Sequence, residues 1–226
     1  MSIWGKILGG VGGFAVGGPL GALLGAAAGH AIDSIRESEP DATVAPDPEK
    51  NAAFTIACIA LGAKMAKADG LVTRDEVNAF KEVFAVPAED RAAMARLFDQ
   101  ARKDVRGFEP YARQVAGLFA DQPEVLEKLI AALFHIAKAD GEVTEDECDY
   151  LRRVSAIFGF DNAAFERIRA IHMADMPGRS DDPYVVLGVS PDADDATLRA
   201  AHRARVRENH PDRLIADGMP EELVAL

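Results

Sequence analysis

The feature that most constrains this chain is an uncharged, glycine-rich stretch near its N-terminus. From Ile7 to Gly29 there is no Asp, Glu, Lys or Arg, and glycine recurs at every fourth position from Gly5. As a helix these 23 residues would extend about 35 Å, enough to cross the apolar core of a bilayer. In water so many glycines would destabilise a helix by about 1 kcal/mol each, whereas lipid forces the backbone to satisfy its own hydrogen bonds. We therefore expect a transmembrane helix within residues 1–32.

The spacing of the glycines also predicts a contact between two copies of the chain. Residues four apart share one face of a helix, so a second helix could approach closely along a stripe without side chains. The glycines of this predicted dimer contact are Gly9, Gly13, Gly17, Gly21 and Gly25. Trp4 and Lys6 suit the lipid interface at the start of the span. Two alternatives stay open, a signal peptide, indicated by the small residues Ala26 and Ala28, and a soluble or peripheral glycine-rich tail.

Charge and composition narrow the remaining possibilities. Over 226 residues the chain has 37 Asp and Glu against 25 Lys and Arg, a formal net charge of −12. Because nucleic-acid binding needs a basic face, we expect no nucleic-acid partner. The only cysteines, Cys58 and Cys148, exclude a disulfide framework and a four-cysteine zinc site. Aromatic residues make up only 7% of the chain, and its many alanines and leucines favour an all-α fold.

Two polar segments divide the chain. Residues 33–50 are rich in proline, serine and acidic residues, which is typical of a linker, and a second break follows at residues 176–181, Met-Pro-Gly-Arg-Ser-Asp. They separate the predicted anchor from a middle region, 51–175, and that region from a C-terminal module, 182–226. Apolar residues of the middle region recur with helical spacing. The expected helices span residues 52–68, 74–85, 88–104, 109–119, 123–139, 145–158 and 162–172. His135 lies among apolar residues, so we expect it in the core.

The middle region contains an internal repeat. Residues 67–76 and 138–147 share the pattern Lys-Ala-Asp-Gly-x-Val-Thr-x-Asp-Glu. In each copy Asp-Gly suits the end of one helix, and Thr followed three residues later by Glu is the capping-box pattern for the start of the next. The structural interpretation is a pair of capped turns, and the functional alternative is divalent-cation binding by their carboxylates. An EF-hand is excluded because Met65 and Ile136 fall at ligand positions. The candidate ligands are Asp69, Asp75, Glu76, Asp140, Asp146 and Glu147.

Through these turns the middle region resembles the TerB-like helical domains associated with tellurite resistance. The resemblance covers residues 50–175 approximately, and it implies an all-helical domain of a kind sometimes associated with divalent cations. Such a cation is the one cofactor we consider. We expect no enzymatic activity, because the sequence has neither a nucleophile–histidine–carboxylate pattern nor a strand-attached phosphate loop.

The C-terminal module has a different set of signals. Residues 182–189, Asp-Pro-Tyr-Val-Val-Leu-Gly-Val, predict a short helix ended by glycine, and Tyr184 and Leu187 are expected in a core. A second helix runs to about residue 208 and stops because Pro211 cannot continue it. Arginine recurs on that helix at every fourth position, in Arg199, Arg203 and Arg207. Such a stripe by itself is an ordinary solvated helix face.

Together with the loop His210-Pro211-Asp212, these signals resemble a J-domain, the DnaJ-type module. The resemblance implies that the loop and the arginine stripe bind a DnaK-type chaperone ATPase and stimulate its ATP hydrolysis. Arg205 and His202 depart from the family pattern, which has apolar packing residues there, so Arg205 should be exposed or salt-bridged. Because Leu226 falls about two turns into the third helix, we expect the rest of that helix to be missing and the module to be marginally stable alone.

The order of the three parts resembles the membrane-anchored DnaJ-like protein A family of Gram-negative bacteria. That resemblance implies an anchor in the bacterial inner membrane, with the bulk of the chain in the cytoplasm, and a co-chaperone role in the stress response. Two other functions remain open. One is a cation-responsive TerB-like interaction module with a vestigial J-like tail, and the other is an oligomeriser built on the glycine stripe.

Overall fold

The computed structural model is helical throughout the part of the chain that it describes. The described residues are 17–28, 48–68, 78, 91–103, 107–141, 143–173, 182–220 and 224. No strand occurs within them, and the expected all-α fold is confirmed. The helices are α3 (Gly18–Ala28), α4 (Pro48–Ala68), α6 (Arg91–Lys103), α7 (Glu109–Leu118), α8 (Pro123–Ala137), the 3-10 helix η2 (Lys138–Asp140), α9 (Glu145–Ile157), α10 (Asn162–His172), α11 (Pro183–Leu187), α12 (Asp195–Glu208) and α13 (Pro211–Ala216).

Helix boundaries in the middle region follow the periodicity of the sequence closely. The helices expected to begin at residues 109, 123, 145 and 162 do begin there. Helix α4 begins at Pro48 rather than at residue 52, since proline fits the first turn of a helix, where its missing N–H is not needed. The helix expected over residues 74–85 lies outside the described residues, apart from Asn78.

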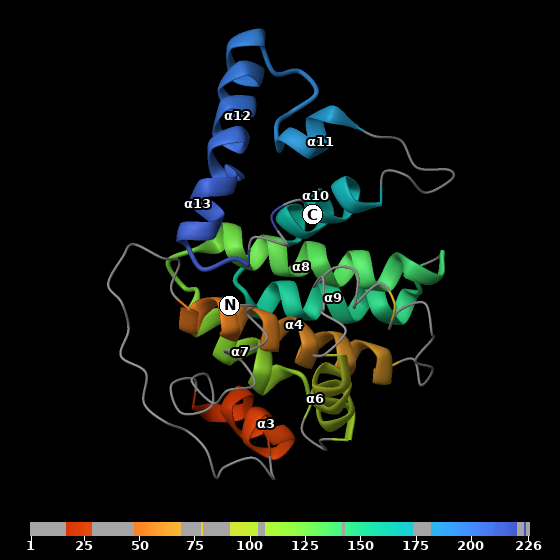
Figure 1. The fold of residues 1–226 in the computed structure, drawn as a ribbon. Coiled ribbons are helices and arrows are strands. Elements are labelled where there is room, and N and C mark those ends of the chain that lie inside the picture. The colour runs from red at the N-terminus through yellow and green to blue at the C-terminus, as the bar shows by residue number, and fades with distance from the viewer. Residues whose placement is uncertain are drawn as a thin grey trace.

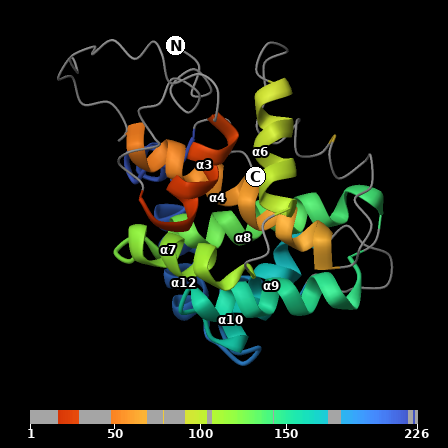
Figure 2. The ribbon, with the colours of Figure 1, turned by 90° about the horizontal axis from the view of Figure 1, so that it is seen from below.

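The hydrophobic core is built around α4, which crosses the middle of the bundle (Figures 1 and 2). Every residue of α4 from Ala53 to Ala66 is buried, and a helix that is apolar on all sides needs neighbours all around it. Helices α6, α7, α8 and α9 provide them. Two polar contacts fix the arrangement: the ammonium of Lys64 lies 5.5 Å from the ring centre of Tyr111, and the Tyr150 hydroxyl donates to the carbonyl of Leu61 at 2.8 Å.

The second copy of the repeated turn is a capped helix turn, as expected. Gly141 ends η2 in the left-handed conformation, with φ of 106°, which glycine adopts at no steric cost. Thr144 then caps α9: its hydroxyl accepts from the N–H of Glu147 at 3.2 Å, and the Glu147 carboxylate accepts from the N–H of Thr144 at 2.8 Å. The capping box is therefore confirmed in this copy, while residues 69–77 of the first copy lie outside the described residues.

The described part of the glycine-rich stretch is α3, which lies against α6 and α7 (Figure 1). Leu20 and Leu23 are buried in the core of the bundle. The amide of Gln114 on α7 fastens the start of α3, since it accepts from the N–H of Leu20 at 2.9 Å and donates to the carbonyl of Gly17 at 2.8 Å. Among the described helices, none is both long and apolar enough to span a membrane. Residues 1–16 of the predicted anchor lie outside the described part.

The expectation that His135 belongs to the core is wrong. Its neighbours Phe134 and Ile136 are buried, but His135 itself is exposed. The reason is helical geometry: His135 is seven residues after Lys128 and three before Lys138, so these polar residues share the outer face of α8 and its extension. The apolar stripe of α8 is wide, and His135 lies beyond its edge.

The C-terminal module leads back to the bundle through α12 and α13. Helix α12 runs from the outer tip of the molecule toward the bundle, and α13 follows it to lie beside the start of α8 (Figure 1). Helix α11 contacts both α10 and α12. The loop that contains His210, Pro211 and Asp212 is thus placed at the junction of α12 and α13, between the tip of the module and the bundle.

Candidate functional site

The three loop residues form the N-terminus of α13. His210 has extended backbone angles, φ −68° and ψ 129°, as the residue before a proline prefers. It is the N-cap residue: its Nδ1 accepts from the N–H of Asp212 at 3.3 Å, so in the neutral ring the proton is on Nε2. Pro211 occupies the first position of the helix, where its fixed φ stabilises the turn. The loop conformation is therefore set by local interactions.

Both ionisable side chains of the loop face solvent. The side chain of His210 is 56% exposed and that of Asp212 is 90% exposed, and Nδ1 lies 3.9 Å from Oδ2. An imidazole and a carboxylate are thus presented together on a short, rigid turn. This arrangement can offer hydrogen bonds to a partner with little ordering cost, because the backbone is already fixed.

The arginine stripe is exposed along α12, whose N-cap is Asp194. Arg199 forms an ion pair with Asp195 at 3.6 Å, but both side chains are well exposed, and such pairs contribute little stability. Arg203 and Arg207 have no ion pair with any described residue of this chain. Their charges are therefore available to an acidic surface of a partner.

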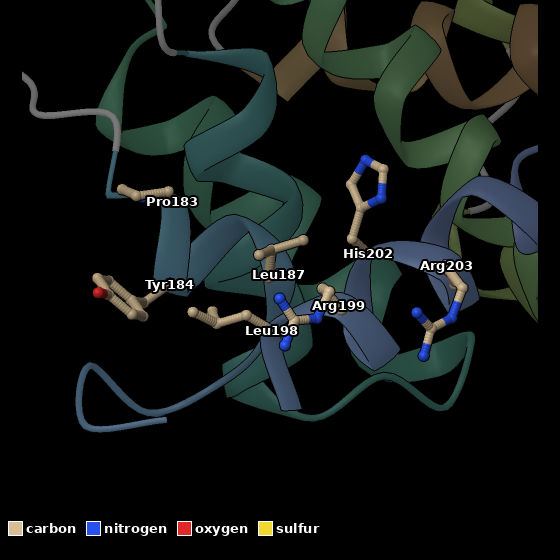
Figure 3. A pocket seen from close by; sticks show the side chains of 7 residues that line it. All are labelled: Pro183, Tyr184, Leu187, Leu198, Arg199, His202 and Arg203. Carbon is tan, nitrogen blue, oxygen red and sulfur yellow. The ribbon is translucent and has the colours of Figure 1, made fainter. Parts of the chain in front are cut away.

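Sequence reasoning missed a groove between α11 and α12. It has a volume of about 460 Å³, and Figure 3 shows side chains of both helices around it. Its lining residues are Pro183, Tyr184, Leu187, Leu198, Arg199, His202 and Arg203. Tyr184 and Leu187, which were expected in a core, are only half-buried here. The nearest signal in the sequence is the departure at His202, where a packing residue was expected.

The other departure, Arg205, is placed as its chemistry requires. Its side chain is 29% exposed and lies 3.2 Å from the Glu208 carboxylate and 3.8 Å from that of Glu127 on α8. Glu127 is also paired with Arg167 of α10 at 2.7 Å. The expectation that Arg205 would be exposed or salt-bridged is confirmed, and the pairing links the module to the bundle.

The candidate cation ligands do not come together in the described residues. Asp69, Asp75 and Glu76 lie outside them, as does the side chain of Asp140. Asp146 is exposed, and Glu147 is engaged in the capping box. No group of three His, Cys, Asp or Glu side chains suited to hold a metal ion occurs in the described ranges. The second turn thus supports the capping interpretation, and cation binding stays a prediction.

The predicted dimer glycines are only partly covered by the structure. Gly9 and Gly13 lie outside the described residues, Gly17 precedes α3, and Gly21 and Gly25 lie within it. Gly21 is buried where α3 meets the bundle of its own chain. The dimer contact stays a prediction.

Comparisons with known proteins cover nearly the whole chain. Residues 55–170 match the family model of the tellurite resistance protein TerB, and residues 1–50 match that of the co-chaperone DjlA transmembrane domain. Among similar proteins, the co-chaperone protein DjlA of Photobacterium profundum is 28% identical, over 99% of this chain and 92% of the relative. The protein of that name from Coxiella burnetii is 26% identical, over 98% and 90%, and that from Escherichia coli K12 is 24% identical, over 100% and 92%. No solved structure matches the chain.

Proposed function

Because this chain belongs to the DjlA co-chaperone family and contains a TerB domain, we propose that its C-terminal module is a J-domain that stimulates ATP hydrolysis by a DnaK-type chaperone. The observation that carries the proposal is the exposed turn of His210, Pro211 and Asp212 at the N-terminus of α13. The turn follows directly on a helix with two exposed arginines, Arg203 and Arg207, that form no ion pair with any described residue.

In this proposal the arginines of α12 and the loop have different roles. The arginines of α12 raise the rate and selectivity of encounter with an acidic surface, since complementary charge steers association. The loop then makes the specific contact, because its imidazole and carboxylate are held in a fixed relation by the His210 cap and by Pro211. In this proposal the chain acts by binding the ATPase, which carries out the hydrolysis.

The membrane anchor gives this activity a location. Residues 1–50 match the family model of the co-chaperone DjlA transmembrane domain, and we propose that this segment anchors the protein in a membrane. We place that anchor in the bacterial inner membrane, with the bundle and the module in the cytoplasm. A DnaK-type ATPase and its ATP are available on that side, so this orientation is the one the proposed activity needs.

The test is ATP turnover by a purified bacterial DnaK in the presence of the full chain in lipid nanodiscs. We expect the wild-type chain to raise the turnover and His210→Gln to abolish the rise, because the substitution removes the imidazole while leaving Pro211 and Asp212 in place. His135→Gln, which changes an exposed histidine on α8, is the matched control and should stimulate as the wild type does. Absence of stimulation by the wild type, or full stimulation by His210→Gln, would overturn the proposal.

A further inference from the structure

Residues 182–213 of the C-terminal module, all of which the structure describes, form no core of their own. Between residues 182 and 213 no residue is buried, and the first buried side chain is Leu214 on α13. Leu214 and Met219 are both 0% exposed, and they belong to the same hydrophobic cluster as α4 and α8. The apolar residues that follow the loop are therefore inserted into the bundle.

Polar contacts of Arg213 and Asp217 with the bundle accompany this apolar contact, and we call the Arg213–Glu124 pair the clamp. Arg213, the residue directly after Asp212, donates from Nη2 to Oε1 of Glu124 at 2.8 Å. Glu124 lies in the first turn of α8, and its side chain is only 18% exposed. Asp217, four residues after Arg213, accepts a hydrogen bond at 3.4 Å from the side-chain amide of Gln122, the N-cap residue of α8. The same amide accepts from Lys50 of α4 at 3.1 Å. Helices α4, α8 and α13 thus meet through both apolar and polar groups.

The turn after α13 is fitted closely to α4. Gly218 has φ of 101°, and a Cβ at this position would lie 2.6 Å from the Cβ of Lys50. A side chain here would force α13 away from the bundle, since real Cβ atoms do not approach one another so closely. The contact therefore depends on a residue that is suited to it both in conformation and in size.

We propose that the N-terminal end of α8, together with Lys50, is an intramolecular docking site for α13 that holds the His-Pro-Asp loop in the orientation its chaperone partner recognises. The inference rests on the proposed function and adds to it a positioning residue, Glu124. Docking presents the loop rather than covering it. Arg213 and Leu214 are fixed to the bundle, whereas the side chains of His210 and Asp212, next to them, are 56% and 90% exposed.

The two partners of the clamp are not equivalent. Oε2 of Glu124 is buried and has no hydrogen-bond partner among the described residues, so removal of Arg213 would leave a largely buried carboxylate without its counter-charge. Removal of Glu124 would leave an arginine that is 44% exposed and lies 3.6 Å from Asp217. We therefore expect Arg213→Gln to loosen α13 more than Glu124→Gln does.

Hydrogen exchange on the full chain in nanodiscs tests the docking itself. In Glu124→Arg and in Arg213→Glu, we expect amides of residues 212–219 to exchange roughly tenfold faster than in the wild type, with α8 and α9 unchanged. The double variant Glu124→Arg/Arg213→Glu, in which the two charges are interchanged, should restore much of the protection against hydrogen exchange. Glu109→Arg is the matched control, since it breaks a pair of similar length, 2.7 Å to Arg153, at the start of α7 away from α13. Wild-type exchange at residues 212–219 in both single variants would overturn the docking site.

Chaperone stimulation tests the positioning role. Arg213 adjoins the loop, so its substitution could disturb the contact with the chaperone directly. The comparison therefore uses Glu124, whose side chain lies on the bundle. We expect Glu124→Arg to raise the concentration needed for half-maximal stimulation of a bacterial DnaK roughly fivefold, with nearly unchanged maximal turnover, because a smaller fraction of the chain presents the loop correctly. An unchanged half-maximal concentration in a variant with faster exchange would overturn the positioning role and leave the proposed function intact. If the wild type gave no stimulation, the proposed function and the positioning role would both fail, and hydrogen exchange would still decide the docking.

Discussion

At the scale of single residues, His172 shows how burial and charge together set a protonation state. It is the last residue of α10, and Lys138 donates to its carbonyl at 3.1 Å. Burial, reinforced by the nearby charges of Lys128, Lys138 and His135, lowers the pKa of His172 from its ordinary 6.5 to about 4. The imidazole is therefore neutral in the folded protein at any pH near 7.

This pKa predicts a loss of stability in mild acid. Between about pH 6.5 and 4 the unfolded chain binds a proton at His172 that the folded chain does not, so the free energy of unfolding falls as the pH falls, by up to about 1.4 kcal/mol per pH unit. His172→Gln should reduce this slope, and His202→Gln, at an exposed position of α12 that is not among the charges acting on His172, should leave it nearly unchanged. Urea unfolding followed by circular dichroism from pH 7 to 4.5 measures the slopes. Equal slopes in His172→Gln and the wild type would contradict the prediction.

At the scale of helices and turns, the left-handed Gly141 and the helical Gly117 form a natural pair for comparison. Gly141 connects η2 to α9 with φ of 106°, and neither glycine has a heavy atom within 4 Å of where a Cβ would be. Neither substitution by alanine would therefore create a clash. Any change in stability comes from the backbone alone.

We expect the same substitution to act in opposite directions at these two positions. Gly141→Ala should destabilise the protein by about 1–2 kcal/mol, because alanine is strained in the left-handed region. Gly117→Ala, on the exposed face of α7, should stabilise it by about 0.5–1 kcal/mol, because alanine has the higher helix propensity. Urea unfolding of the two variants provides the comparison, and a shift of the same sign in both would show that contacts, rather than backbone conformation, dominate.

The elements are also the scale at which the sequence was most informative. Periodicity and the Asp-Gly and Thr-x-x-Glu signals predicted the start of α9 and its cap, because a capping box is formed by residues only three positions apart. The loop at Pro211 could be predicted for the same reason. The contacts of Glu124 with Arg213 and of Gln114 with Leu20 could not, because partners about 90 residues apart in sequence leave no local pattern. The exposure of His135 was not predicted because its sequence neighbours are apolar, although its helical spacing from Lys128 and Lys138 places it on the polar face of α8.

At the scale of the whole molecule, both ends of the described chain are fastened to the same bundle. Helix α3 is attached to α7 through Gln114, and α13 is attached to α8 through Glu124 and Leu214. Since Leu214 is part of the core around α4, the TerB-like bundle and the C-terminal module share apolar contacts. Their stabilities should therefore be linked.

This linkage predicts that a change in the module weakens the bundle. Leu214→Ala removes a side chain that is 0% exposed, which should lower the free energy of unfolding by about 2–4 kcal/mol. Val206→Ala on α12, where the side chain is 55% exposed, should change it by less than about 0.5 kcal/mol. Circular dichroism during urea unfolding reports mainly on the bundle, since most helices belong to it. A bundle transition that is the same in Leu214→Ala as in the wild type would contradict the linkage.

The position of Leu214 and Met219 in the core of the bundle has a consequence for recombination between proteins. A boundary drawn at residues 176–181 looks suitable for exchange, because it is polar and lies between two sequence patterns. A chimera that carries residues 182–226 to another host would, however, expose both side chains and leave Arg213 without Glu124. The smallest transferable unit is therefore the module together with α4 and α8, so the two parts are expected to be inherited and engineered as a pair.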